Sequence, residues 1–178
     1  MFNISIVLYR PNWQQVRQLC EELLSAKDLR YLYLVDNSPM DGAIYVPHDS
    51  HIQYLWNEGE NIGYGAAHNI AIRHSIYLHT AFHLVMNADV QVRVQDLERL
   101  YLYLEQHRQV GLLIPQTIYP SGVKQYVGRL LPTPWDMLSR RFLPPVLTKR
   151  RNAFFELTLE DLSAREIANT FAFPLAKS

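Results

Sequence analysis

The feature that most limits the folds open to this chain is an alternation of short apolar runs with amphipathic helical patterns. One helical pattern begins after Asn12, another at 65–79, and a third contains Leu97, Leu100, Tyr101 and Leu104. Strands that alternate with helices predict a mostly parallel sheet with right-handed crossovers and helices on both faces. The predicted fold class is therefore a doubly wound α/β domain. The apolar runs that predict its strands are residues 4–9, 31–35, 52–56, 82–86 and 110–114.

This alternation ends near residue 115. A turn sequence at 119–122 precedes a candidate hairpin strand at 123–127, and residues 132–151 mix prolines, aromatic and basic residues. We place the change of character near residue 130. Residues 1–130 are predicted to form the ligand-binding half, and residues 131–178 an irregular, partly helical segment of the same domain.

Composition narrows the function classes. Seventeen basic residues balance seventeen acidic ones, and no dense basic stripe indicates nucleic acid as a partner. The single Cys20 forms no internal disulfide, and no Cys/His cluster has the spacing of a zinc site. No apolar run approaches the roughly 20 residues that a membrane span needs, and the amino-terminus does not resemble a signal peptide. These observations predict a cytoplasmic protein.

Polar residues follow four of the predicted strands. They are Tyr9-Arg10, residues 36–38, the glycine turn at 61–65 and residues 87–89. In open α/β sheets, ligands bind at the carboxyl ends of the strands, where the winding reverses. The four segments are therefore expected to meet at one edge, although polar turns follow strands in any protein.

The glycine turn "NIGYGAAHN" is neither a dinucleotide fingerprint nor a phosphate-binding P-loop. His68 stands where the fingerprint has its third glycine, and no Lys-Ser/Thr follows. Gly63 and Gly65 either permit positive φ before a helix or line a ligand. Asn69 is a poor helix former, so a bond to the neighbouring loop is expected of it.

The segment "VMNADV" interrupts an apolar strand with Asn87 and Asp89. One carboxylate cannot hold a divalent ion alone, but Mg²⁺ and Mn²⁺ often take few protein ligands and complete their shell with phosphate oxygens and water. Such an ion would absorb the charge of a diphosphate leaving group. The alternative is that Asp89 is an ordinary capping or turn residue.

Five segments together resemble the family 2 glycosyltransferases with the GT-A (Rossmann-like) fold, in particular the rhamnosyltransferase-like branch that builds bacterial surface polysaccharides. They are "ISIVLYRPN", "YLVDNSP", "NIGYGAAHNIAI", "HLVMNADV" and "VGLLIPQTIYPSGVKQYVGRLLP", within the first 150 residues. The resemblance implies a dTDP- or UDP-sugar donor and a divalent metal (Mg or Mn). It also implies that a hydroxyl of a saccharide or lipid-linked acceptor attacks the anomeric carbon with inversion.

The resemblance also assigns residues. Asn87-Ala88-Asp89 stands where the family has its Asp-x-Asp-like element, so Asp89 is expected at the metal, with Asn87 replacing the first acid. Asn69 is expected to brace the glycine loop. The remaining assignments are Leu8, Tyr9 and Asp36 at the nucleotide base, and Asn61, Gly63 and Gly65 at the base, ribose and phosphates.

The family's acidic block, which holds the catalytic base, has only a weak counterpart in Glu160-Asp161, because Ser163 replaces the second acid. No catalytic base is assigned, and the GT-A domain is expected to be incomplete at its C-terminus. The prediction is a donor-binding half of a glycosyltransferase, whose activity as a 178-residue chain is open. The alternative is a non-catalytic nucleotide-sugar-binding or assembly module. A nucleotidyltransferase is disfavoured because "LYRPNW" contains no glycine.

Three further expectations concern surfaces. Basic residues 140–141 and 149–151, interleaved with apolar ones, form either a solvated loop or a peripheral contact with the inner face of an anionic membrane. An uncovered sheet edge would favour a homo-oligomer. His68, His74, His79 and His83 lack the pattern of a metal site and are expected at surface or hydrogen-bonded positions.

Overall fold

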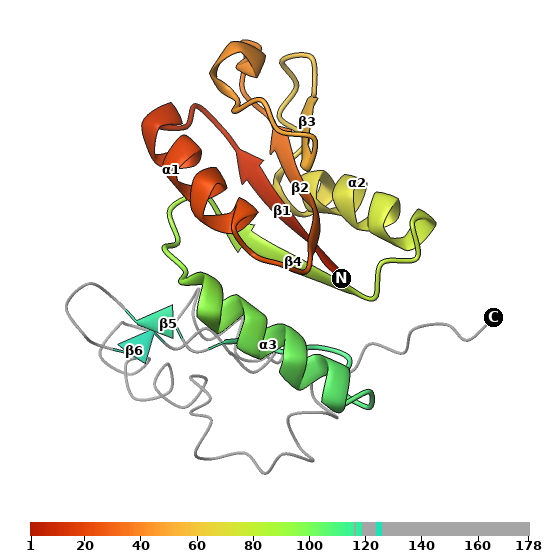
Figure 1. The fold of residues 1–178 in the computed structure, drawn as a ribbon. Helices are drawn as coiled ribbons and strands as arrows, with labels where there is room; N and C mark the ends of the chain where they lie inside the picture. The colour runs from red at the N-terminus through yellow and green to blue at the C-terminus, as the bar shows by residue number, and fades with distance from the viewer. Residues whose placement is uncertain (116, 119–123, 126–178) are drawn as a thin grey trace, which may run out of the picture. The chain divides into compact units, whose positions relative to one another are not determined.

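The computed structural model describes residues 1–115, 117–118 and 124–125. The chain divides into two compact units, Met1–Glu105 and Gln106–Ser178, and each is described by itself. The described elements, in chain order, are β1 (Phe2–Leu8), α1 (Trp13–Leu24), β2 (Leu29–Asp36), a 3-10 turn η1 (Ala43–Tyr45), β3 (Ile52–Trp56), α2 (Tyr64–Tyr77), β4 (Phe82–Asn87), α3 (Val94–Gln106), β5 (Thr117–Ile118) and β6 (Lys124–Gln125) (Figure 1).

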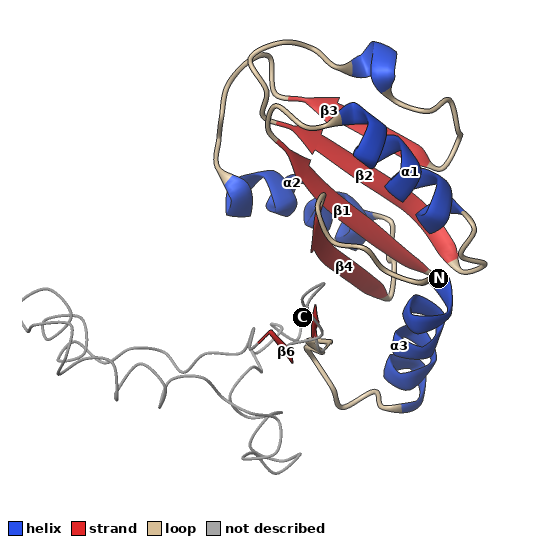
Figure 2. Ribbon diagram, turned by 90° about the vertical axis from the view of Figure 1, so that its left-hand side faces the viewer, coloured by secondary structure: helices blue, strands red, loops and turns tan. Residues whose placement is uncertain are grey.

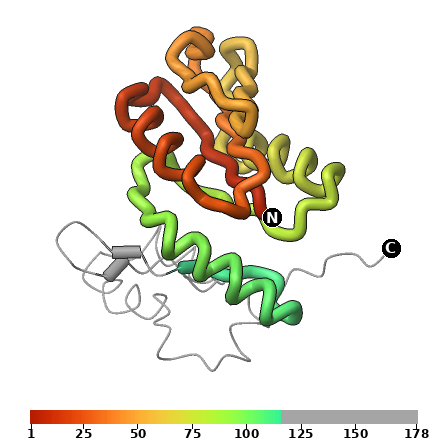
Figure 3. Tube along the Cα trace, viewed as in Figure 1, coloured from red at the N-terminus to blue at the C-terminus, as the bar shows by residue number. Residues whose placement is uncertain are grey.

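The first unit is built on a four-stranded parallel sheet with the order β3-β2-β1-β4. The chain moves outward from β1 to β3 and then crosses back to β4, so the winding reverses between β1 and β4. The first strand therefore lies inside the sheet, as the trace shows (Figure 3). The carboxyl ends are in register, because Leu8 pairs with Asp36 and Asp36 pairs with Trp56. Asn87 of β4 pairs with Val7.

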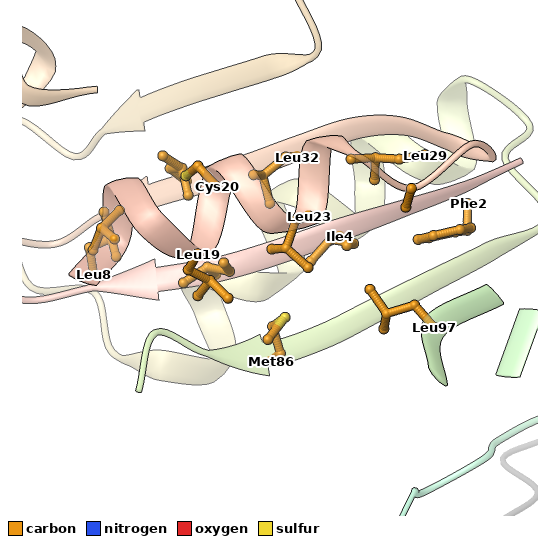
Figure 4. Packing of buried hydrophobic residues seen from close by; sticks show 14 residues of the cluster. Phe2, Ile4, Leu8, Leu19, Cys20, Leu23, Leu29, Leu32, Met86 and Leu97 are labelled. Atoms are coloured by element: carbon orange, nitrogen blue, oxygen red, sulfur yellow. The ribbon is translucent and has the colours of Figure 1, made fainter. Parts of the chain in front are cut away.

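Helices cover both faces of this sheet, which confirms the predicted α/β class (Figure 2). The α1 face carries the larger core, in which alternate residues of β1 and β2 meet α1, Met86 of β4 and Leu97 of α3 (Figure 4). The α2 face has a smaller apolar cluster, formed by Tyr33, Val35, Ala67 and Ala71. Asn3 and Ser5 of β1 are fully buried polar residues. The two faces therefore differ in chemistry, one apolar and one partly polar.

Local sequence explains the ends of α1. The Oδ1 atom of Asn12 accepts hydrogen bonds from the backbone N–H groups of Gln14 (3.1 Å) and Gln15 (3.4 Å), which confirms the expected cap. The buried positions of the helix recur at helical spacing and include Cys20. Burial raises the pKa of the Cys20 thiol to about 12, so the thiol stays protonated and serves as a core residue.

The region after α3 differs from the sequence-based expectation. Residues 110–114 form no strand in the structure, because an apolar run becomes a strand only where another strand supplies hydrogen-bond partners. The expected hairpin is present: β5 and β6 are antiparallel, with Thr117 opposite Gln125. The predicted boundary near residue 130 and the basic segment at 140–151 lie outside the described residues. Within the described part of the chain, no helix is long and apolar enough to cross a membrane.

Candidate functional site

The carboxyl edge of the sheet brings together all four polar segments predicted from the sequence. Asp36, at the end of β2, is fully buried. Its Oδ1 accepts a hydrogen bond from the backbone N–H of Ser38 (2.8 Å), and its Oδ2 accepts one from the Tyr54 hydroxyl (2.8 Å). Burial and the bond to Asp36 raise the pKa of Tyr54, so the hydroxyl remains a donor. Asp36 therefore fixes the loop after β2.

The end of β1 is held against that loop. The backbone N–H of Arg10 donates to Ser38 Oγ (2.8 Å), and the N–H of Asn37 donates to the carbonyl of Leu8 (2.9 Å). Arg10 has φ 48°, in the left-handed region that a residue with a side chain seldom adopts. The Leu8 side chain lies in the core, whereas Tyr9 is exposed. Of the two residues at the end of β1 that were predicted to contact a base, only Tyr9 offers its side chain at the edge.

The glycine loop between β3 and α2 is braced by amides. The Oδ1 atom of Asn61 accepts from the backbone N–H of Gly63 (3.1 Å) and from Nδ2 of Asn37 (3.3 Å). Gly63 caps α2 with φ 85°, which explains the glycine there. Gly65 is helical, and a Cβ added to it would meet no atom within 4 Å, so neither conformation nor crowding requires its glycine. Asn69 is exposed on α2, and Asn37 supplies the bracing expected of it.

Gly63 and Gly65 form a matched pair for a substitution test. Gly63→Ala is expected to lower the free energy of unfolding by roughly 1–2 kcal/mol, because alanine is strained at positive φ. Gly65→Ala is expected to leave it unchanged or raise it by up to about 1 kcal/mol, because alanine favours a helix. Urea denaturation measures both values. Since neither position crowds an added methyl group, equal effects would contradict the conformational explanation.

The end of β4 is tied to the start of α2. The Tyr64 hydroxyl donates to Oδ1 of Asn87 (2.7 Å), and the Tyr64 ring meets the His68 ring edge-on, with centroids 4.3 Å apart. Partial desolvation of the half-exposed Tyr64 and the charge of Asp89 raise the pKa of its hydroxyl. Asp89 is exposed in the turn after β4. It also borders a pocket of about 460 Å³ between α1 and that turn, lined in part by Gln15, Gln18 and Arg93.

The oxygen atoms at this edge suit a hard cation that takes most of its ligands from a bound molecule and from water. In the described residues, no group of three or more His, Cys, Asp or Glu side chains gathers. Asp89 offers an exposed carboxylate, whereas Oδ1 of Asn87 already accepts the Tyr64 hydroxyl. Mg²⁺ and Mn²⁺ accept one protein carboxylate when phosphate oxygens and water complete the shell. The edge therefore fits such an ion only together with a phosphate-bearing ligand.

A buried polar chain lies beneath α2. Ser5 Oγ is 2.7 Å from both His68 Nδ1 and His83 Nε2, and His83 Nδ1 is 2.7 Å from Ser75 Oγ. Asn3 Nδ2 donates to Ser75 Oγ (2.7 Å). Burial lowers the pKa of both histidines, to about 4 for His83, where His68 adds to the effect. Both rings are therefore neutral at neutral pH, and Ser5 donates to one ring and accepts from the other.

Acidification is expected to weaken the fold through His83. Its pKa of about 4 in the folded chain lies below the ordinary value of 6.5, so the unfolded chain binds the proton more readily. The free energy of unfolding should then fall, on the order of 1–2 kcal/mol, as pH decreases from about 6.5 toward 4. Urea denaturation across this range measures the slope. His83→Gln should reduce that slope, and His48→Gln, at an exposed site, should not. Equal slopes in wild type and His83→Gln would contradict the assignment.

Several residues of this edge were not singled out from the sequence. Tyr64 and Asn37 make the bonds that join the loops, and Tyr54 holds Asp36. Their partners lie 18 to 24 residues away along the chain, so spacing carried no signal of these contacts. His68 is buried and hydrogen-bonded through Nδ1 to Ser5, in line with the expectation of a hydrogen-bonded position. Its Nε2 has no hydrogen-bond partner among the described residues, which the sequence did not indicate.

The family of the chain is shown by a match over most of its length. The family model described as glycosyl transferase family 2 matches residues 4–163. The chain belongs to glycosyl transferase family 2. This match and the parallel β3-β2-β1-β4 sheet confirm the predicted GT-A fold.

Solved structures similar to this family 2 chain include two of S. aureus TarS. TarS 1-349 has 16% identity over 67% of this chain and 39% of that chain, with a TM-score of 0.42. A second TarS structure has 14% identity over 67% of this chain and 24% of that chain, with a TM-score of 0.40. This chain thus matches less than half the length of either. No curated protein matches it at a significant level.

Proposed function

We propose that this family 2 domain binds a nucleotide-sugar donor at the carboxyl edge of its sheet and serves transfer of the sugar to an acceptor hydroxyl. The single observation that carries the proposal is the convergence of four polar loops at the reversal point between β1 and β4, in a chain of this family. Ligands of open α/β sheets bind at this point.

The loops suit different parts of such a donor. Exposed Tyr9, beside the hydrogen-bonded loop after β2, is proposed to contact the nucleotide base, with Asp36 holding that loop. The glycine loop is proposed to line the ribose and phosphates, with Asn61 and Asn37 shaping it. The glycine at position 65, in the first turn of α2, supports a close approach of the ligand to the helix, because neither the backbone conformation nor crowding explains a glycine there.

Asp89 is proposed to hold a divalent ion, Mg²⁺ or Mn²⁺, together with the donor diphosphate. When bound, such an ion stabilises the negative charge that develops on the leaving diphosphate. The protein contributes the exposed carboxylate of Asp89, two residues after Asn87, whose side chain is bonded to Tyr64 at the start of α2. The N-terminal end of α2 adds backbone N–H groups, which favour anionic groups.

We further propose a dTDP- or UDP-linked donor, a rhamnosyltransferase-like specificity, inversion at the anomeric carbon, a saccharide or lipid-linked acceptor of polysaccharide biosynthesis, and a location in the cytoplasm or at the inner face of the membrane. The weak counterpart of the family's acidic block, at 160–161, lies outside the described residues. A catalytic base is therefore not part of the proposal.

Calorimetric titration of the full chain with UDP and dTDP, in the presence and absence of Mn²⁺, tests donor binding. Metal-enhanced binding of one of these diphosphates is expected, and no binding of either would contradict the proposal. Sugar transfer from dTDP-rhamnose or a UDP-sugar to an acceptor tests catalysis. A chain that binds but transfers nothing would favour the alternative of a nucleotide-sugar-binding module.

A further inference from the structure

We propose that Tyr64 is a positioning residue that holds the oxygen of the Asn87 amide, so that Asn87 offers its NH₂ group to the nucleotide-sugar and leaves metal binding to Asp89. This inference rests on the proposed donor site. It adds that the two polar residues of "NAD" have opposite roles, and that a residue of α2 sets this difference.

The geometry that supports it begins with the hydroxyl. The Tyr64 O–H donates to Asn87 Oδ1 at 2.7 Å, a good distance for such a bond. A side-chain amide has one oxygen acceptor and two N–H donors. With Oδ1 directed at Tyr64, Nδ2 lies on the opposite branch of the amide. Asn87 is exposed, so that NH₂ group is available to a ligand.

Tyr64 is itself held in place. Its ring rests edge-on against His68, which is 3% exposed and whose Nδ1 is 2.7 Å from Ser5 Oγ of β1. The Tyr64 orientation thus depends on a buried ring bonded to the central strand. Partial desolvation and the neighbouring charge of Asp89 raise the pKa of Tyr64, so the hydroxyl stays protonated and able to donate.

This arrangement decides which ligand atoms suit each residue. An amide NH₂ group attracts anionic phosphate oxygens or a ribose hydroxyl, and it repels a cation. The Asp89 carboxylate has the opposite preference. A diphosphate with one divalent ion offers both kinds of partner. An acid at position 87 would place a second negative charge beside Asp89 and the diphosphate, which one divalent ion would have to neutralise. The neutral amide of Asn87 avoids that charge.

A double-mutant cycle in the full chain tests this role, with UDP and dTDP as probes, each with and without Mn²⁺. Tyr64→Phe keeps the ring over His68 and removes only the hydroxyl. We expect it to weaken diphosphate binding about fivefold, both with and without Mn²⁺, because one hydrogen bond orders the amide. In an Asn87→Ala background, the same substitution should have no effect. Tyr77→Phe, at the exposed far end of α2, is the matched control and should bind as wild type does.

The Mn²⁺ dependence of diphosphate binding supplies a second measurement. It would not change if Asn87 had only a structural role. Asn87→Asp should weaken binding in the absence of Mn²⁺ and increase the enhancement that Mn²⁺ gives. Unchanged binding by Tyr64→Phe, or an equal loss in the Asn87→Ala background, would overturn this inference alone. Failure of the wild-type chain to bind either diphosphate would instead overturn the proposed function. The proposed hydrogen bond from Asn87 to the nucleotide-sugar would fall with it.

Discussion

Replacing Asp89 with asparagine is expected to lower the Mn²⁺-dependent affinity for UDP or dTDP by about 100-fold, because the ion loses its charged protein ligand. Without Mn²⁺, the same variant should bind as well as wild type or better, since a carboxylate near a diphosphate is repulsive. Calorimetric titration with and without the metal gives both numbers. The melting temperature of the unliganded chain should change little, because Asp89 is exposed in a turn.

Asp49→Asn is the matched control for this result. Asp49 is also an exposed turn aspartate, but it precedes β3, at the opposite end of that strand from the carboxyl edge, where its Oδ1 accepts from the His51 N–H (2.8 Å). Its substitution should leave diphosphate affinity unchanged. If Asp89→Asn lost equal affinity with and without Mn²⁺, the role of Asp89 as the metal ligand would be wrong.

Asp36→Ala is expected to lower the free energy of unfolding by about 3 kcal/mol, the largest stability effect expected among these substitutions. The change removes a fully buried carboxylate and leaves the Tyr54 hydroxyl and the Ser38 N–H without their acceptor. Each buried group that loses its partner incurs a desolvation cost. Urea denaturation followed by far-UV circular dichroism measures the loss.

Asp49→Ala provides the comparison, because Asp49 makes the same type of bond at the surface. Its Oδ1 accepts from the backbone N–H of His51 (2.8 Å) in an exposed turn, where water can replace the lost acceptor. A loss below about 1 kcal/mol is expected there. Similar losses for the two variants would show that the burial of Asp36 and its two partners does not increase the cost of losing the carboxylate. Asp36→Ala should also weaken the binding of UDP or dTDP, because the proposal places the loop after β2 against the nucleotide base.

Much of the fold could be predicted from local patterns. The run at 52–56 matches β3, and the Asn12 cap and the periodicity of α1 locate its first turn and its buried face. Such elements are predictable because their cause is local: a cap uses nearby donors, and a strand or helix repeats its apolar period. The run at 110–114 was the failure, because apolar content alone does not supply a pairing strand.

The site was predictable in position but not in detail. Strand ends are visible in a sequence, so Asp36, the glycine turn and Asp89 were expected at one edge, where the structure has them. Which side chain bonds to which was not visible. Asp36 reaches Tyr54 across 18 residues, and Tyr64 reaches Asn87 across 23.

The sequence alone determined the alternating architecture, the family and the residue types at the carboxyl edge, since these follow from periodicity and from motifs read in chain order. Only the tertiary structure decided the surroundings of those residues. Asp36 is buried with both oxygens bonded, Asp89 is exposed, and Oδ1 of Asn87 accepts the Tyr64 hydroxyl. The physical reason is that burial and hydrogen-bond direction depend on contacts between distant segments, and these contacts exist only once the strands are aligned.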